Sequence, residues 1–277
     1  MQDISLPITL AVLGAAALHA GWNALLKSSA DKQLDTVAIS VGAAFVSLAL
    51  APWLAHPAPA SWPWLAASAS VHILYFLFLA GAYHWGELSY TYPIMRGGGP
   101  VIVALAGTAV FGEVLAPLPT LGVALVCAGI VAFASGKAHP RATLFALGNA
   151  AVIAAYTLID AKGARLSGSP VAYTLWFFIA NGVLIYAWYG ARRGARVPRY
   201  LARNWPRILV GAVFTTGAYG VALWAMTQAP VALVAVLRET AVLFGALIAT
   251  LFLGEKFTRR RFVATGAVLA GLVMLRL

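Results

Sequence analysis

The sequence predicts an all-α integral membrane protein with ten transmembrane helices in two inverted five-helix repeats. Composition is the first observation: 62% of the residues are hydrophobic, 10% are charged and the mean hydropathy is +0.86. A soluble domain would carry about 25% charged residues. The second observation is that the apolar residues gather in ten runs, each near the ~20 residues that a helix needs to cross a bilayer. The third is that one unusual run occurs twice.

The ten runs account for nearly the whole chain. Short connections with turn-forming residues separate them, as in Ser29-Ala30-Asp31-Lys32, so no soluble domain fits between them. The first run follows Asp3 and has no basic leader, so we interpret it as a retained helix and not as a signal peptide. We expect spans at about 4–27, 35–54, 63–85, 90–111, 118–135, 142–160, 170–190, 207–226, 231–253 and 262–276.

The repeated run is Tyr90–Glu113, and its second copy is Ala232–Glu255. A shift of 142 positions superposes Arg96 on Arg238 and brings the closing Gly-Glu pairs together. We therefore predict repeats at 1–136 and 137–277. Because each half has an odd number of spans, the second half would be inserted upside down, as in many secondary transporters.

Basic residues are distributed unequally between the two predicted faces. The face of the first connection carries fourteen Lys and Arg, the face with both termini carries three, and the remaining two are Arg96 and Arg238. The positive-inside rule places the basic face in the cytoplasm and both termini in the periplasm, for a chain in a bacterial inner membrane. Since these residues lie in short connections, the net charge of +11 does not indicate nucleic-acid binding.

Two arginines lie inside the repeated runs, where a guanidinium costs about 2.5–3.5 kcal/mol unless it meets a partner or a watery cavity. Arg96 is followed by Gly97-Gly98-Gly99-Pro100. Pro100 leaves the carbonyl of Arg96 without its helical donor, and the glycines weaken the same turn. We predict a hinge beside a cation here; close packing of a neighbouring helix is the alternative.

Glu239 follows Arg238 and is the one acid that we place deep in a span. Three roles stay open for it: a structural pair with Arg96, an acceptor for a substrate ammonium, or a carrier of a coupled proton. Two arginines and one glutamate leave a core charge of +1, which suits an anionic group. Glu113 and Glu255 lie at the ends of spans, and we interpret both as caps of the following helices.

Polar residues recur at helical spacing in four other spans. In lipid such stripes turn inward, so we expect them to face a shared cavity, although any single member is more often a helix–helix hydrogen bond. The stripes are His19, Trp22 and Asn23; His72, Tyr75, Phe76, Leu79 and Tyr83; Asn149, Tyr156 and Asp160; and Thr215 and Tyr219.

The chain carries no signal for catalysis, a cofactor or a metal. It has no His-Glu-x-x-His motif, no cysteine cluster and a single cysteine, Cys127, so we do not expect an enzyme or a disulfide. The connection 191–206 mixes arginines with Tyr200, Leu201 and Trp205. It is either a site for anionic membrane lipids or a solvated basic loop.

These motifs resemble the drug/metabolite transporter superfamily, in particular ten-helix proteins with two EamA-type repeats. The markers are Pro100 with the block 101–113, then Gly122 and Gly129 at fixed spacing, and His19-Ala20-Gly21-Trp22-Asn23 with Lys27. The resemblance implies an inner-membrane carrier with a central cavity that works by alternating access without ATP, similar to YddG-type amino-acid exporters. Members are often drawn with both termini in the cytoplasm, whereas the basic loops here predict the reverse.

We therefore hypothesise a secondary transporter, monomeric as a fused pair of repeats, that moves small carboxylate-bearing metabolites such as aromatic or other neutral amino acids outward. Two alternatives stay open: a carrier of a larger anion (a nucleotide sugar, a phosphonate or a lipid-linked sugar), and a non-transporting intramembrane enzyme or scaffold. The predicted substrate-binding residues are His19, Trp22, Asn23, His72, Tyr75, Tyr83, Arg96, Tyr156, Arg238 and Glu239.

Overall fold

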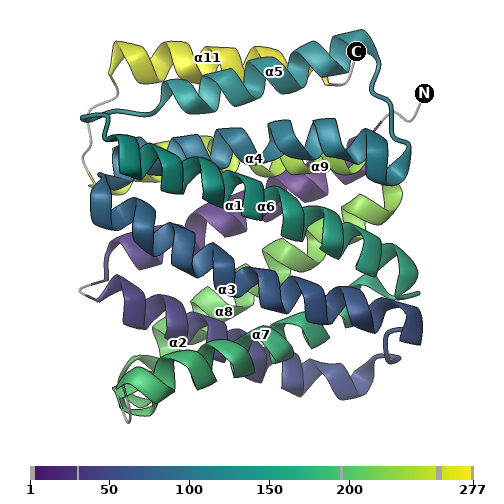
Figure 1. Ribbon diagram of the computed structural model, residues 1–277, viewed down its shortest axis with the longest axis vertical. Helices are drawn as coiled ribbons and strands as arrows, with labels where there is room; N and C mark the ends of the chain where they lie inside the picture. Colours follow the sequence, from purple (N-terminus) through teal and green to yellow (C-terminus); the bar gives the residue numbers. More distant parts are fainter. Residues whose placement is uncertain (1–3, 30, 194–195, 254–257, 276–277) are drawn as a thin grey trace.

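The computed structural model describes residues 4–29, 31–193, 196–253 and 258–275, and all regular structure over these residues is helical (Figure 1). Two short 3-10 turns, η1 (Ala51–Trp53) and η2 (Pro59–Ser61), connect α2 to α3. The helices are α1 (Leu6–Lys27), α2 (Lys32–Leu50), α3 (Trp62–Trp85), α4 (Leu88–Phe111), α5 (Pro117–Ala132), α6 (Pro140–Leu166), α7 (Pro170–Arg193), α8 (Arg196–Gln228), α9 (Val231–Arg238), α10 (Ala241–Leu253) and α11 (Arg259–Met274).

The predicted class is confirmed: the chain is an all-helical integral membrane protein. Within the described residues, eight helical stretches are long and apolar enough to cross a membrane, and α5 is a shorter apolar helix. The outer surface fits a lipid environment, since large apolar side chains such as Phe45, Leu105 and Leu144 are 62%, 73% and 71% exposed. The count of ten crossings stays a prediction.

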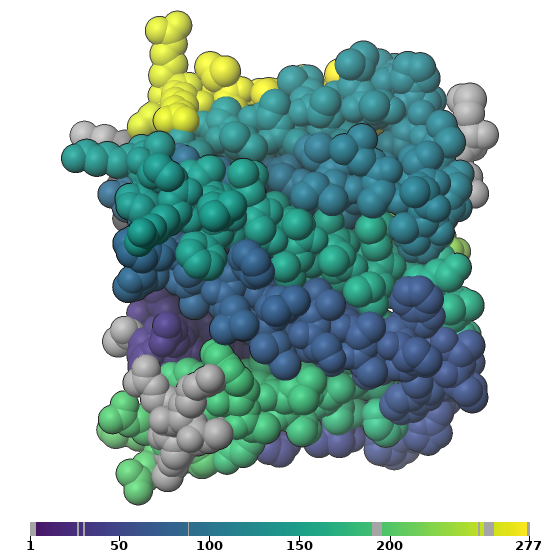
Figure 2. Space-filling model, viewed as in Figure 1, coloured from purple at the N-terminus to yellow at the C-terminus, as the bar shows by residue number. Residues whose placement is uncertain are grey.

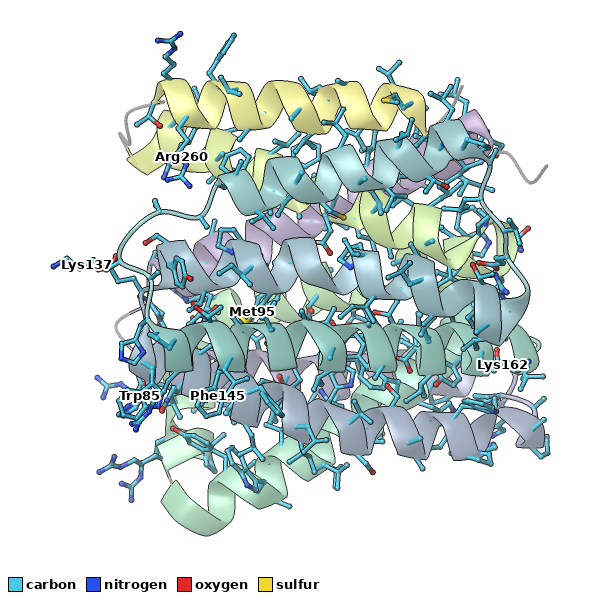
Figure 3. The ribbon with its side chains drawn as sticks, turned by 45° about the horizontal axis from the view of Figure 1, so that its top comes forward. Trp85, Met95, Lys137, Phe145, Lys162 and Arg260 are labelled. Atoms are coloured by element: carbon cyan, nitrogen blue, oxygen red, sulfur yellow. The ribbon has the colours of Figure 1, made fainter. Side chains whose placement is uncertain are left out.

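Charged and aromatic residues mark the two ends of the bundle. Trp85, Lys137 and Arg260 project from the end where α3 finishes and α6 begins, and Lys162 projects from the opposite end (Figure 3). The guanidinium carbon of Arg141 lies 4.4 Å from the centre of the Trp85 ring. This arrangement suits the boundaries between a membrane and water.

Helix pairs far apart in sequence build the bundle. Helices α5 and α11 pack together along one edge, and α2 and α7 pack together at the opposite edge (Figure 1). Between them, α6 packs on α3 and α4, while α1 packs on α8 and α10. Side chains fill the spaces between these ribbons on the face seen in Figure 2.

Helices α5 and α11 approach closely through small residues and run antiparallel. A Cβ on Gly122 would lie 2.8 Å from the Gly271 carbonyl oxygen, and a Cβ on Gly129 would lie 3.0 Å from the Ala264 carbonyl oxygen. Because the position rises along α5 as it falls along α11, the two helices run in opposite directions. Small residues allow this close backbone contact between membrane helices.

The predicted opening of the chain at Gly97–Pro100 is wrong, because α4 is helical from Leu88 to Phe111. The glycines serve close packing, the alternative interpretation. A Cβ on Gly97 would lie 3.0 Å from the Cys127 carbonyl oxygen of α5, and one on Gly99 would lie 3.0 Å from Ile153 Cγ2 of α6. Packing on both sides holds the turn in helical form despite Pro100. A hinge role at this turn stays a prediction.

The chain instead breaks in the second copy of the repeated run, which we expected to be one helix. Helix α9 ends at Arg238 and α10 begins at Ala241. Around the break the Glu239 and Thr240 amides donate to carbonyls three residues earlier, and the Thr240 hydroxyl donates to the Leu237 carbonyl at 2.7 Å. A side-chain hydroxyl that bonds a local carbonyl competes with the helical backbone bond.

Candidate functional site

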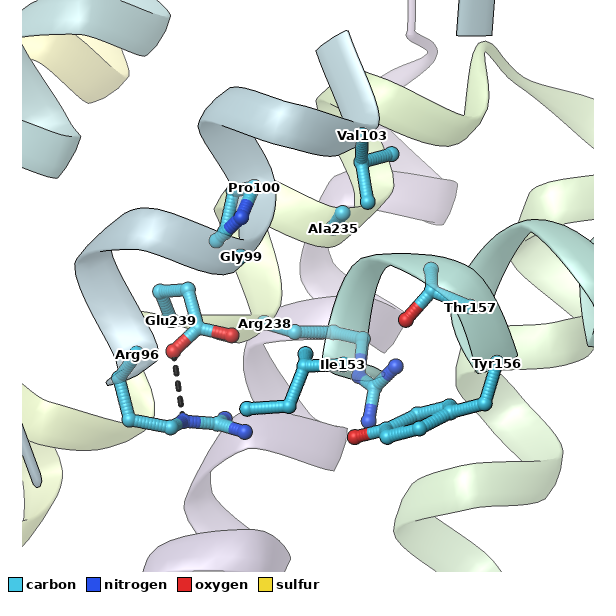
Figure 4. Close-up of a pocket in the computed structure, with 10 residues that line it drawn as sticks. All are labelled: Arg96, Gly99, Pro100, Val103, Ile153, Tyr156, Thr157, Ala235, Arg238 and Glu239. Atoms are coloured by element: carbon cyan, nitrogen blue, oxygen red, sulfur yellow. Dashed lines mark ion pairs between the residues drawn. The ribbon is translucent and has the colours of Figure 1, made fainter. Parts of the chain in front are cut away.

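A pocket lies where α4, α6 and α9 meet in the interior of the bundle (Figure 4). It offers about 10 Å³ to the centre of a water-sized sphere, roughly the space of one water molecule. The site is therefore nearly closed at its centre. Its lining residues are Arg96, Gly99, Pro100, Val103, Ile153, Tyr156, Thr157, Ala235, Arg238 and Glu239.

Arg96 and Glu239 form a buried ion pair across this pocket. The Arg96 Nε and a Glu239 carboxylate oxygen are 2.8 Å apart, and the two side chains are 9% and 5% exposed. Of the three roles open for Glu239, the structural pair is the one observed. The second terminal nitrogen (Nη2) of Arg96 is buried and has no hydrogen-bond partner. The pair neutralises the charge of Arg96, but it leaves part of the guanidinium unsatisfied.

Arg238 has a different environment from Arg96. Among the described residues no carboxylate lies within ion-pair distance of its guanidinium. Its guanidinium carbon lies 5.2 Å from the centre of the Tyr219 ring, a distance typical of a cation–π contact. Figure 4 shows the same side chain reaching across the pocket towards Tyr156. Arg238 therefore brings a positive charge without a directly bonded anion to the pocket.

Aromatic rings line the side of the site formed by α3, α6 and α7. The His72 ring lies 4.3 Å from the Tyr156 ring and 4.8 Å from the Phe177 ring, centre to centre. Tyr75 stands edge-on to Tyr156 at 6.1 Å. His72 is held by a hydrogen bond between its Nδ1 and the Ser68 carbonyl, at 2.9 Å. These rings form a polar-edged aromatic wall behind Tyr156.

Asp160 is a second buried acid beside this wall. Its side chain is fully buried, and its carboxylate accepts hydrogen bonds from the Tyr173 hydroxyl, at 2.9 Å, and from the Tyr219 hydroxyl. Our prediction that Glu239 is the one deep acid is therefore wrong, and so is the core charge of +1. Asp160 balances Arg238, as Glu239 balances Arg96.

The predicted residues of α1 and the end of α3 lie outside the lining of this pocket. Trp22 Nε1 donates to His19 Nδ1 at 3.3 Å, and Asn23 Nδ2 donates to the His19 carbonyl at 2.7 Å. His19 is within electrostatic range of Arg96 and Arg238, so this face of α1 is directed to the centre. Tyr83 is 38% exposed and stands farther along α3. A direct role for these four residues in ligand binding stays a prediction.

A second ion pair ties helix ends together at the end of the bundle opposite Trp85. Arg165 at the end of α6 bonds Glu113 at 2.6 Å and donates to the Met226 carbonyl at 2.9 Å. Glu113 also accepts from the Val231 amide, at 2.8 Å. Glu113 thus caps the start of α9 and not that of α5, the following helix that we predicted. Glu255 lies outside the described residues.

Comparisons with known proteins agree with this architecture. The model of the EamA-like transporter family matches residues 140–277. The chain belongs to the EamA-like transporter family. A solved structure titled only "Crystal structure of protein" is similar, with a TM-score of 0.71 at 17% identity, and it covers 96% of this chain and 94% of that one. That likeness supports the shared fold. No curated protein sequence matches the chain.

Membership of the EamA-like family makes this chain a membrane transporter of small solutes. Sequence reasoning found four polar residues of the pocket, Arg96, Tyr156, Arg238 and Glu239, from two signals: charge within an apolar run and polar stripes. It placed Asp160 and Tyr219 in such stripes but gave them no role. It missed Tyr173 entirely, because a tyrosine near the start of a span reads as an interfacial residue.

Proposed function

We propose that this EamA-like protein is a secondary transporter of small carboxylate-bearing metabolites, with aromatic and other neutral amino acids as the preferred class. The proposal rests above all on Arg238, a cation that reaches the pocket without a carboxylate partner among the described residues. A guanidinium in this position attracts a carboxylate strongly, because its planar fork matches the two oxygens and little water screens the contact. Arg96 is less available, since Glu239 already occupies it.

The aromatic wall supports the preference for an aromatic or apolar side chain. Tyr156 lies between Arg238 and the rings of His72, Phe177 and Tyr75. Aromatic groups favour edge-to-face or offset contacts with one another. A ligand whose carboxylate meets Arg238 could therefore direct its side chain toward this wall once the pocket opens.

The packing supports two inverted repeats and hence alternating access. The repeat relates Gly122 to Ala264 and Gly129 to Gly271, and the contacts Gly122–Gly271 and Gly129–Ala264 exchange under that relation. Helix pairs exchange in the same way, since α6 packs on α3 and α4 while α1 packs on α8 and α9–α10. Two units with exchangeable contacts favour two states of similar energy that open to opposite sides.

The pair Glu113–Arg165 supports one closed end in the present state. It joins the end of α4 to the end of α6 and to the turn between α8 and α9. The elements that carry Arg96 and Arg238 are therefore held together at this end. Opening there would require the pair to separate.

The basic end of the bundle, with Lys137 and Arg260, would face the cytoplasm of a bacterial inner membrane (Figure 3). We also propose outward transport when the internal metabolite is in excess. A reporter fused after Leu277 tests the orientation: alkaline phosphatase should be active and green fluorescent protein dark. The reverse pattern would place the termini in the cytoplasm.

Counterflow in proteoliposomes tests the function. Vesicles loaded with unlabelled L-phenylalanine should accumulate external radiolabelled L-phenylalanine, and 3-phenylpropanoate should compete, because both carry a carboxylate. L-Phenylalaninamide, which lacks the carboxylate, should not compete. Loss of counterflow in Arg238→Gln would support the site. Absence of counterflow for every neutral amino acid tested, or equal competition by the amide, would contradict the proposal.

A further inference from the structure

Asp160 is a carboxylate sealed inside the protein. It comes from α6, it is fully buried, and both of its oxygens accept from phenol hydroxyls: Oδ1 from Tyr173 of α7 and Oδ2 from Tyr219 of α8. Tyrosine hydroxyls are neutral donors. A buried carboxylate held by neutral groups keeps much of its desolvation cost, unlike one that is bonded directly to a cation.

Asp35 provides the contrast within the same molecule. It is also fully buried and accepts from a phenol, that of Tyr200, at 3.2 Å. In addition, Arg207 Nε lies 3.2 Å from its other oxygen, which makes a direct ion pair. Asp160 has no Lys, Arg or His nitrogen within ion-pair distance among the described residues. Its charge therefore depends on a cation that is farther away.

That cation is Arg238, on the other side of a single aromatic ring. The Tyr219 hydroxyl bonds Asp160, and the face of the same ring receives the Arg238 guanidinium at 5.2 Å. The charge of Arg238 thus stabilises the ionised form of Asp160 through a region of low dielectric, where such interactions are strong. Whatever neutralises Arg238 also withdraws this support from Asp160.

We infer that Asp160 takes up a proton when a substrate carboxylate binds Arg238, so that one proton travels with each carboxylate. The inference rests on the proposed function. The proton comes from water on the open side, it bonds to a carboxylate oxygen of Asp160, and it returns to water on the other side when the substrate leaves. The site then holds a neutral acid and a neutral carboxylate–guanidinium pair, which carries no uncompensated charge through the membrane.

The groups around Asp160 allow this exchange and offer few alternatives. The neighbouring side chains that are charged or can titrate are His72 from α3, Tyr156 from α6 itself, Tyr173 from α7, Tyr219 from α8, Arg96 from α4, and Arg238 and Glu239 from α9. Glu239 already has Arg96 as a direct partner at 2.8 Å. Asp160 is therefore the acid whose charge balance changes most when Arg238 is occupied.

Coupling of this kind makes two predictions about driving forces. A monocarboxylate moves with its proton without net charge, and a zwitterionic amino acid moves with one positive charge. An acidic exterior would oppose efflux, so outward transport would depend on a high internal concentration of the metabolite. Binding of proton and carboxylate would strengthen each other, as linkage requires.

Calorimetry on the purified full-length protein tests the coupling directly. Titration with L-phenylalanine in two buffers of different ionisation enthalpy should show uptake of about one proton per ligand, with an affinity that falls about tenfold for each pH unit where uptake is complete. Asp160→Asn, which stands for the protonated acid, should bind without proton uptake and with a flat pH profile. Asp35→Asn is the matched control and should keep the proton uptake.

Infrared difference spectroscopy on the wild type covers the case in which Asp160→Asn does not fold. Addition of L-phenylalanine should produce a carboxylic-acid C=O band, and ¹³C labelling of the aspartate side chains should shift it, which separates aspartates from Glu239. Ligand binding without proton uptake, proton uptake that persists in Asp160→Asn, or a band that the aspartate label does not shift would overturn the inference. Absence of binding by any carboxylate would instead overturn the proposed function.

Discussion

Arg96 and Arg238 occupy the same position in the two repeats, yet their surroundings differ. Arg96 lies within the continuous helix α4 and is paired with Glu239 at 2.8 Å. Arg238 ends α9 and lies over the Tyr219 ring, at 5.2 Å. The same shift of 142 positions relates Glu239 to Gly97. One repeat thus has a glycine where the other has an acid.

This difference shows how a duplicated site can divide its roles. Gly97 removes a side chain so that α5 can approach within contact of α4. Glu239 uses the equivalent position to neutralise the arginine of the other repeat. One guanidinium is thereby committed to holding α4 and α9 together, and the other stays available to a ligand.

The largest effect is expected on stability, from removal of Arg96. Arg96→Gln leaves Glu239 buried without a cation, which costs about 3–5 kcal/mol in such pairs. Arg238→Gln should cost clearly less, because no acid bonds Arg238 directly. Thermal unfolding in detergent micelles measures both. The double variant Arg96→Gln/Glu239→Gln should recover most of the loss; if it does not, the pair is not the source of the stability.

Transport should respond in the opposite order. Arg238→Gln should lower kcat/KM for L-phenylalanine by roughly a hundredfold, since loss of one partner of a buried charge contact costs about 2–5 kcal/mol. The double variant Arg96→Gln/Glu239→Gln, which removes the committed pair as a unit, should lose less than tenfold. Equal losses in both would mean that the two arginines share the ligand.

The glycines give a third test, with a matched control in the same helix. Gly97→Ala would place a Cβ 2.7 Å from Val131 Cγ2 and 3.0 Å from the Cys127 carbonyl oxygen, so the free energy of unfolding should fall by about 1–3 kcal/mol. Gly107 has no heavy atom within 4 Å of that position, and Gly107→Ala should raise it by up to about 1 kcal/mol. Similar results for both would remove the packing role of Gly97.

The smallest effect is expected at the break between α9 and α10. Thr240→Val keeps the shape but removes the hydroxyl that bonds the Leu237 carbonyl, which should cost about 0.5–1.5 kcal/mol. If the hydroxyl helps to end α9, the variant should also raise the helical signal in far-ultraviolet circular dichroism. An unchanged stability would assign the break to the surrounding packing alone.

Most of the fold could be predicted from the sequence, because apolar runs, turn residues and a repeat leave clear one-dimensional patterns. The predicted ninth span shows the limit. Its sequence has no proline or glycine near Glu239, whereas Gly97–Pro100 has four such residues in a row, yet the break lies in the former and not in the latter. Packing on α5 and α6 decides the outcome at Gly97–Pro100, and such contacts are not visible in the local sequence.

The site was predictable to the extent that charge in an apolar run is rare. Arg96, Arg238 and Glu239 stand out for that reason, and the pair Arg96–Glu239 was one of the open alternatives. The partners of Asp160 were not predictable, since Tyr173 and Tyr219 come from two other helices. Their convergence depends on the order in which the helices pack.

Ligand binding to purified protein tests the central claim, that Arg238 and not Arg96 holds the substrate's carboxylate. The affinities of L-phenylalanine and of L-phenylalaninamide should be compared in the wild type, in Arg238→Gln and in Arg96→Gln/Glu239→Gln. We predict that the preference for the carboxylate disappears in Arg238→Gln and survives in the double variant. A preference that survives in Arg238→Gln and disappears in the double variant would contradict this account.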